Sequence, residues 1–141
     1  MPNHDAFTYI DSDLDSIFEE IREREPIFHT REFGNTVVDF DSVMAPEYWE
    51  VGASGRRYSR DFILHYLAES PPLDAAAAGW RSEGYGLRRL GPDTYLFTYT
   101  LHQGQRVTRR ATIWQSAPEG WRILYHQGTI VSGEEDDVAP S

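Results

Sequence analysis

Apolar residues near the start of the chain recur with the period of an α-helix. Between Asp11 and Glu25 they follow an i, i+3, i+4, i+7 spacing, with acidic residues on the other face; the apolar set is Leu14, Ile17, Phe18 and Ile21. Asp11 or Ser12 can serve as the N-cap. Because the residue before a proline disfavours helical geometry, Pro26 should end this helix. The pattern therefore predicts an amphipathic helix over residues 11–25.

Two further helices and one strand are predicted before residue 70. Thr36 can cap a short helix that runs to Met44, and Ser59 can cap another that runs to about Glu69. The apolar face of the later helix comprises Phe62, Ile63, Tyr66 and Leu67. The aromatic and β-branched run Tyr48–Val51 predicts a strand, and Gly52–Gly55 a turn.

From residue 80 onward the apolar and polar positions alternate, as in antiparallel strands. Turn-forming residues separate four such runs, which are Trp80–Leu90, Thr94–Gln103, Gln105–Gln115 and Trp121–Ile130. Helices grouped against an antiparallel meander predict a single α+β domain over residues 11–131. An N-terminal extension (1–10) precedes it. The acidic tail that follows (132–141) has the composition of a disordered segment.

Alternation also predicts which side chains of the meander share a face. If Trp114 lies opposite Trp121, and Leu101 opposite Arg106, one face is large and aromatic with a few polar groups; it carries Tyr95, Phe97, Tyr99, Leu101, Thr108, Arg110, Thr112, Trp114, Trp121, Ile123, Tyr125 and Gln127. Ligand pockets have this character. The other face is flatter, with Leu96, Thr98, Thr100, Val107, Arg109, Ala111, Ile113, Arg122, Leu124 and His126. A β-bulge would exchange these assignments locally.

Composition excludes several classes of function. The net charge of −10 argues against nucleic acid or an anionic membrane as a partner. The chain has no cysteine, so thiol catalysis and disulfides are excluded, and no lysine, so Schiff-base chemistry is excluded. The five histidines lack metal-site spacing, and we expect neither a metal nor an organic cofactor. With no apolar run long enough to span a membrane and no visible secretory signal, we expect a cytoplasmic protein.

Three segments together resemble a known superfamily. They are EVGASG at residues 50–55, RRYSR at 56–60, and the final hairpin ATIW…GWRILYHQGT. From about Leu14 to Thr129 the chain resembles the nuclear transport factor 2-like superfamily, also called the cystatin-like cone or SnoaL-like fold, and most of all its uncharacterised domain-of-unknown-function branch. The final hairpin is also similar to that of the calmodulin-dependent kinase association domain.

The resemblance implies a cone-shaped, curved antiparallel sheet packed on three N-terminal helices, with a pocket between them. It also implies a homodimer through the outer sheet face, here the face of Arg109, Leu124 and His126. Relatives range from ketosteroid isomerases, dehydratases and cyclases to plain assembly modules, so the fold alone leaves the reaction open. Isomerase and cyclase relatives use an inward acid or histidine as the base. By position that acid is Glu50, unless Val51 is the inward residue.

Two charged residues are the candidates for chemistry. A sealed Glu50 carboxyl would have a raised pKa and could act as a base, or it could form an ion pair with Arg110 or Arg60 that fixes the first strand. Arg110 could bind a carboxylate or an enolate oxygen, or pair with Glu50. The predicted binding residues are Trp49, Tyr99, Arg110, Trp114, Tyr125 and Gln127.

These residues predict a pocket for a small, largely apolar molecule with an oxygen-bearing or carboxylate end. A cofactor-free proton transfer, of isomerase, cyclase or dehydratase type, is the first hypothesis, with Glu50 as base. A non-catalytic dimerisation or ligand-binding module is the alternative.

Overall fold

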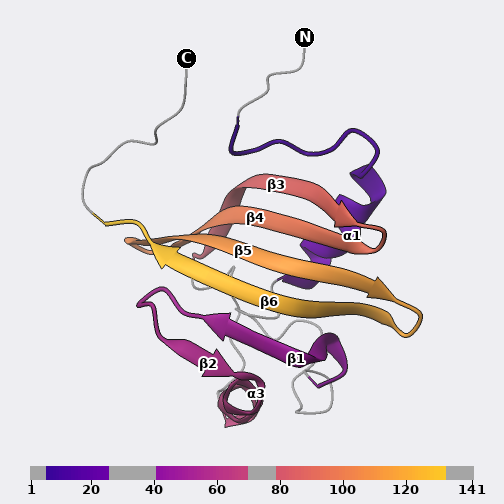
Figure 1. Ribbon diagram of the computed structural model, residues 1–141. Coiled ribbons are helices and arrows are strands. Elements are labelled where there is room, and N and C mark those ends of the chain that lie inside the picture. The colour runs from indigo at the N-terminus through magenta and orange to yellow at the C-terminus, as the bar shows by residue number, and fades with distance from the viewer. Residues whose placement is uncertain (1–5, 26–40, 70–78, 133–141) are drawn as a thin grey trace.

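Two helices and six strands fill the parts of the chain that the computed structural model describes, residues 6–25, 41–69 and 79–132. Their order is α1 (Asp15–Arg24), β1 (Met44–Val51), β2 (Arg57–Ser59), α3 (Arg60–Glu69), β3 (Arg81–Gly91), β4 (Thr94–Gln103), β5 (Arg106–Ala117) and β6 (Gly120–Ile130). The strands form one sheet in the order β2-β1-β6-β5-β4-β3 (Figure 1). The expected α+β architecture with a curved sheet is confirmed.

The sheet is a meander extended at one edge by an earlier piece of chain. β3, β4, β5 and β6 pair antiparallel in sequence order, as the alternation predicts. β1 joins β6 in parallel and β2 in antiparallel orientation. β2 is not predicted from the sequence. The predicted helix over residues 36–44 falls largely outside the described residues; of those described, 41–43 are helical and Met44 opens β1.

α1 carries the predicted apolar stripe, but it begins later than expected. The helix starts at Asp15 with Leu14 at its N-cap and no side-chain cap. The prediction that Asp11 or Ser12 caps it is wrong. The Asp11 carboxylate instead accepts a hydrogen bond from the backbone N–H of Arg89 at 3.0 Å, which ties the approach to α1 to β3.

α1 crosses one face of the sheet, on the side away from the viewer in Figure 1, and we call this the inner face. Leu14 and Ile21 are fully buried there, in one apolar cluster with Phe97, Trp114 and other residues of the meander. Burying an apolar side chain of this size stabilises the fold by roughly 1.5–3 kcal/mol. The stripe on α1 and the alternation in β4 and β5 therefore act together to hold the helix against the sheet.

Pairing within the meander differs from the predicted register in three ways. Between β4 and β5, Leu101 lies opposite Thr108 rather than Arg106, a shift of two residues that leaves the faces unchanged. Between β5 and β6, Trp114 lies opposite Ile123 rather than Trp121, which is again a shift of two residues. The pairing then passes to Ile113↔Tyr125, so that Leu124 is an extra, bulged residue. A one-residue insertion exchanges the faces of everything beyond it. The predicted faces of Tyr125, His126 and Gln127 are therefore wrong.

α3 is fastened to β1 at its first turn. The Ser59 hydroxyl accepts a hydrogen bond from the backbone N–H of Phe62 at 3.2 Å, which confirms Ser59 as the N-cap. Arg60 then donates to the carbonyl oxygens of Ala45 at 3.0 Å and Met44 at 3.2 Å, and pairs with Asp41. One arginine thus holds the start of the strand that carries Glu50. No helix among residues 6–25, 41–69 and 79–132 is long and apolar enough to cross a membrane.

Replacing the cap of α3 should lower stability by a predictable amount. Ser59→Ala removes the acceptor for the Phe62 N–H, and we expect a loss of about 1 kcal/mol in the free energy of unfolding, measured by urea denaturation. Ser116→Ala, at an exposed serine of β5, is the matched control and should leave that free energy unchanged. Equal stability of Ser59→Ala and the wild type would contradict the capping role.

Candidate functional site

A buried carboxyl lies at the centre of the inner face. Glu25 follows the last residue of α1 and is 3 % exposed. Its Oε2 accepts hydrogen bonds from the Tyr99 hydroxyl at 2.7 Å and the Thr112 hydroxyl at 2.8 Å, and its Oε1 accepts one from the Trp114 indole at 2.9 Å. Three donors from β4 and β5 thus converge on one acid.

Sequence reasoning did not select Glu25, although a signal for it exists. Glu25 lies four residues after Ile21 and so continues the buried stripe of α1. An acid at a stripe position, directly before a helix-ending proline, is a candidate for burial. Because the acids of this helix were assigned to its exposed face, Glu25 was not expected to be buried.

Burial raises the pKa of the Glu25 carboxyl to about 7. The hydrogen bonds from Tyr99, Trp114 and Thr112, and the positive charge of Arg110, act in the opposite direction but do not offset the desolvation. A carboxyl with a pKa near neutrality can change its charge under physiological conditions, which is the property required of an acid–base group.

His126 lies beside Glu25 and is 2 % exposed. Its Nδ1 is 2.7 Å from the Thr112 Oγ1 and 3.6 Å from the Glu25 Oε2, and its Nε2 is 3.4 Å from the Arg110 Nη1. The prediction that His126 belongs to the outer face is wrong, because the bulge at Leu124 turns it inward.

Glu50 shares this face because it lies opposite His126 in the β1–β6 register, so Glu50 and not Val51 points inward. Its Oε1 accepts a hydrogen bond from the Tyr48 hydroxyl at 2.5 Å. Burial raises the pKa of Glu50, while the Tyr48 hydroxyl and the Arg110 charge lower it. The expected alternative of an ion pair with Arg110 or Arg60 is not found, since Arg60 binds Asp41 and the start of β1 instead.

The other predicted binding residues divide between the two faces. Tyr99, Arg110 and Trp114 lie on the inner face with Glu25. Trp49, Tyr125 and Gln127 lie on the outer face, which corrects their placement in the pocket. Trp49 is 44 % exposed, its ring lies 5.0 Å from that of Tyr125, and the Tyr125 hydroxyl donates to Gln127. Adjacent residues of a strand face opposite ways, so Trp49 cannot accompany Glu50.

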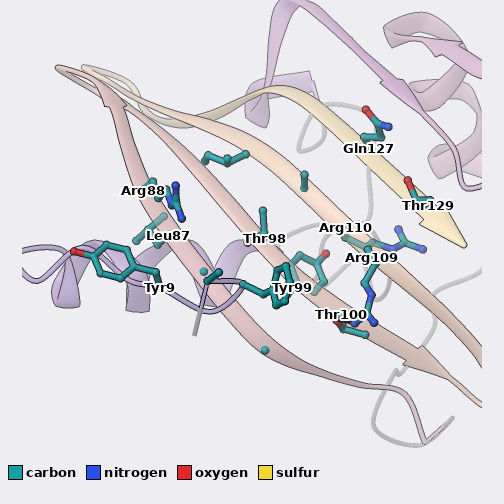
Figure 2. A pocket seen from close by; sticks show the side chains of 16 residues that line it. Tyr9, Leu87, Arg88, Thr98, Tyr99, Thr100, Arg109, Arg110, Gln127 and Thr129 are labelled. Carbon is teal, nitrogen blue, oxygen red and sulfur yellow. Dashed lines mark hydrogen bonds between the residues drawn. The ribbon is translucent and has the colours of Figure 1, made fainter. Parts of the chain in front are cut away.

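The outer face carries a groove of about 660 Å³ between residues 6–9 and the strands β3 to β6. Figure 2 shows Arg109 next to Thr100, to which it donates at 2.6 Å, with Gln127 and Thr129 on β6. Gly86 permits the close approach of the N-terminal segment, because a Cβ there would lie 3.2 Å from the Phe7 carbonyl oxygen. Tyr99 and Arg110, which also act on Glu25, are among the residues that line this groove. Among the described residues, no group of three histidines or acids could hold a metal ion.

Solved structures similar to this chain share its fold at low sequence identity. A protein of unknown function of the DUF3225 family from Pectobacterium atrosepticum is 19 % identical, with a TM-score of 0.61 over 86 % of this chain and 94 % of its own. A nuclear transport factor 2-like protein from Cytophaga hutchinsonii is 13 % identical, with a TM-score of 0.59 over 85 % and 99 %. The CamKII hub homology domain from Chlamydomonas reinhardtii is 13 % identical, with a TM-score of 0.61 over 84 % and 99 %.

The chain has the nuclear transport factor 2-like fold. The same arrangement is called cystatin-like, and the predicted resemblance is confirmed at the level of fold. No protein-family model and no curated protein sequence matches the chain significantly. Since nuclear transport factor 2-like folds support many functions, the function must be argued from the site.

The raised pKa of Glu25 predicts a dependence of stability on pH. The folded protein holds this proton up to about pH 7, whereas an unfolded glutamate loses it near 4.5. Below pH 4.5 the protonated Glu25 therefore makes its full contribution to the free energy of unfolding. This contribution, at most about 3 kcal/mol, is lost as the pH rises through 7. Glu25→Gln should remove this slope from urea-denaturation curves measured between those pH values. Glu23→Gln, an exposed acid on the same helix, should retain it, and equal slopes in Glu25→Gln and the wild type would contradict the buried titration.

Proposed function

We propose that the inner face binds a small, largely apolar molecule through Arg110 and transfers a proton with Glu50. One observation carries this proposal. Glu50 and Arg110 are both only partly buried and lie close enough for the Arg110 charge to act on Glu50, yet they form no ion pair. Opposite charges kept near each other but apart are suited to contact the two ends of one reacting group.

The hydrogen bonds of Arg110 leave part of its guanidinium for a ligand. Its Nε donates to the Thr108 hydroxyl at 3.0 Å, and its Nη1 lies 3.4 Å from His126. Among the described residues, Nη2 has no hydrogen-bond acceptor. A guanidinium with an unsatisfied N–H edge can bind a carboxylate or an oxygen on which negative charge develops.

Glu50 is better suited than Glu25 to touch the substrate. Both oxygens of Glu25 are occupied by donors, and its side chain is sealed from solvent. Glu50 accepts a single described hydrogen bond, from Tyr48, and its pKa is raised by burial. A carboxylate with a raised pKa is a stronger base than an exposed one.

The proposed reaction needs no cofactor. The Glu50 carboxylate accepts a proton from the carbon next to a carbonyl. The electron pair of the broken C–H bond forms a C=C bond, and the π pair of the carbonyl moves onto its oxygen. Arg110 stabilises the negative charge on that oxygen. Return of the proton from Glu50 to another carbon of a conjugated enolate gives isomerisation, and its transfer to a departing β-hydroxyl releases water and gives dehydration.

Exchange with deuterated water tests this reaction without knowledge of the natural substrate. We expect the protein to accelerate deuterium incorporation at the α-carbon of at least one ketone in a panel of cyclic and aromatic ketones, followed by proton NMR. Glu50→Gln should abolish the acceleration while leaving the circular dichroism spectrum unchanged. Glu47→Gln, an exposed acid on the same strand, is the control and should exchange at the wild-type rate. Full exchange activity in Glu50→Gln would exclude Glu50 as the base.

A second proposal concerns assembly, and the outer face supports it. An apolar row crosses four strands there in register, from Trp49 through Tyr125 and Ile113 to Leu96. Trp49 is 44 % exposed and the other three side chains are partly exposed, and a contiguous apolar row open to solvent is typical of an interface. We propose that two copies of the chain pack through this row, with Arg109 and Leu124 on the same face, while His126 takes no part. This packing would serve an enzyme and a non-catalytic module alike.

A charge placed in the apolar row should disrupt the dimer. Ile113→Glu would bury an unpaired carboxylate between the two copies, and we expect the sedimentation coefficient to fall from that of a dimer to that of a monomer. Ser116→Glu introduces the same charge at an exposed position of the same strand and should remain dimeric. A monomeric wild type at micromolar concentration would contradict the proposal.

A further inference from the structure

The Thr112 hydroxyl lies between two buried titratable groups. Its Oγ1 is 2.8 Å from the Glu25 Oε2 and 2.7 Å from the His126 Nδ1. Thr112 is itself fully buried, and β5 fixes its backbone through pairing on both sides, with Phe97 and His126. A hydroxyl has one proton to donate and can accept another, so it can satisfy both neighbours only with one particular placement of protons.

The hydrogen bond to Arg110 requires one of the two neutral tautomers of His126. A guanidinium can only donate, so the His126 Nε2, 3.4 Å from the Arg110 Nη1, accepts this hydrogen bond only when it carries no proton. The ring proton of neutral His126 is then on Nδ1, which donates to the Thr112 Oγ1. The Thr112 hydroxyl in turn donates to the ionised Glu25. Donors and acceptors are matched along the whole series of hydrogen bonds from Arg110 to Glu25.

The opposite tautomer of His126 would disrupt this series of hydrogen bonds at two places. A proton on Nε2 would point at the N–H groups of Arg110, and a bare Nδ1 would compete with Glu25 for the single Thr112 proton. Leaving buried groups without a partner costs free energy in each case. The carboxylate therefore selects the tautomer of His126 through Thr112.

We propose that Thr112 is a positioning residue that fixes His126 as the Nδ1–H tautomer and thereby orients the guanidinium of Arg110. His126 accepts a hydrogen bond from Nη1 and Thr108 accepts one from Nε. These two hydrogen bonds fix the plane of the Arg110 guanidinium and therefore the direction of its remaining N–H edge. Holding a binding group in place before the ligand arrives reduces the entropy lost on binding. Only the link from this orientation to ligand binding rests on the proposed function.

Nitrogen NMR of the protein labelled with ¹⁵N-histidine tests the tautomer directly. At about pH 8, above the Glu25 pKa of about 7, wild-type His126 should show a protonated Nδ1 and an unprotonated Nε2. His126→Gln identifies the signal by its disappearance. A wild-type Nε2–H tautomer would overturn the proposal whatever the variants do.

Two substitutions of similar size separate positioning from packing. Thr112→Ser keeps the hydroxyl and should keep the Nδ1–H tautomer. Thr112→Val keeps the shape without the hydroxyl and should shift His126 toward Nε2–H, with the Arg110 Nε–H resonance broadened as the guanidinium loses its fixed orientation. An unchanged tautomer and a sharp Arg110 resonance in Thr112→Val would overturn the positioning role.

A ligand titration separates this proposal from the proposed function. With benzoate as an aromatic carboxylate probe, calorimetry should give about tenfold weaker binding to Thr112→Val and wild-type affinity for Thr112→Ser. If benzoate and the ketone panel fail to bind the wild type while His126 is the Nδ1–H tautomer, the proposed function fails and the positioning of Arg110 by Thr112 stands. Equal benzoate affinities in Thr112→Val and the wild type would overturn the link between orientation and binding.

Discussion

One extra residue in β6 decides which side chains of the last strand reach the inner face. Because Leu124 is bulged out of the pairing with β5, His126 lies opposite Thr112, and the neighbouring β1 places Glu50 opposite His126. With regular pairing, His126 would point to the outer face, and Glu25 and Arg110 would have no imidazole between them. β-Bulges are frequent beside functional sites for this reason, since they redirect a side chain without breaking the sheet.

The burial of the Glu25 carboxyl and its hydrogen bonds depend on both α1 and the sheet. Withdrawing a carboxylate from water is unfavourable, and the raised pKa shows that three hydrogen bonds do not fully compensate for it. Those donors come from β4 and β5, while the acid comes from the end of α1. The same contact that is costly for stability therefore fixes where α1 ends against the sheet. Polar groups retained in a core at such a cost are candidates for function.

The sequence predicts the strands of the meander, and the stripe of α1, because both rest on periodicity. The predicted register between β4 and β5 is wrong by two residues, but an even shift leaves every side chain on its predicted face. Tyr99, Arg110 and Trp114 are therefore placed correctly. The bulge at Leu124 has no signature in the alternation, and it reverses the face of every residue after it in β6. The site was therefore only half predictable from periodicity, and Glu25 was missed because an acid in a helix is usually exposed.

The two inner carboxyls illustrate how one face can separate structural and chemical roles. Glu25 is enclosed by three donors, so in the proposed function it acts on a ligand through its neighbours Thr112, His126 and Arg110. Glu50 has one described donor and remains partly exposed, so it can meet a ligand itself. Environments that differ in this way give neighbouring acids different tasks. Arg110 is the group they share, since its charge lowers the pKa of both, and its fixed edge defines where a negatively charged oxygen would lie relative to Glu50.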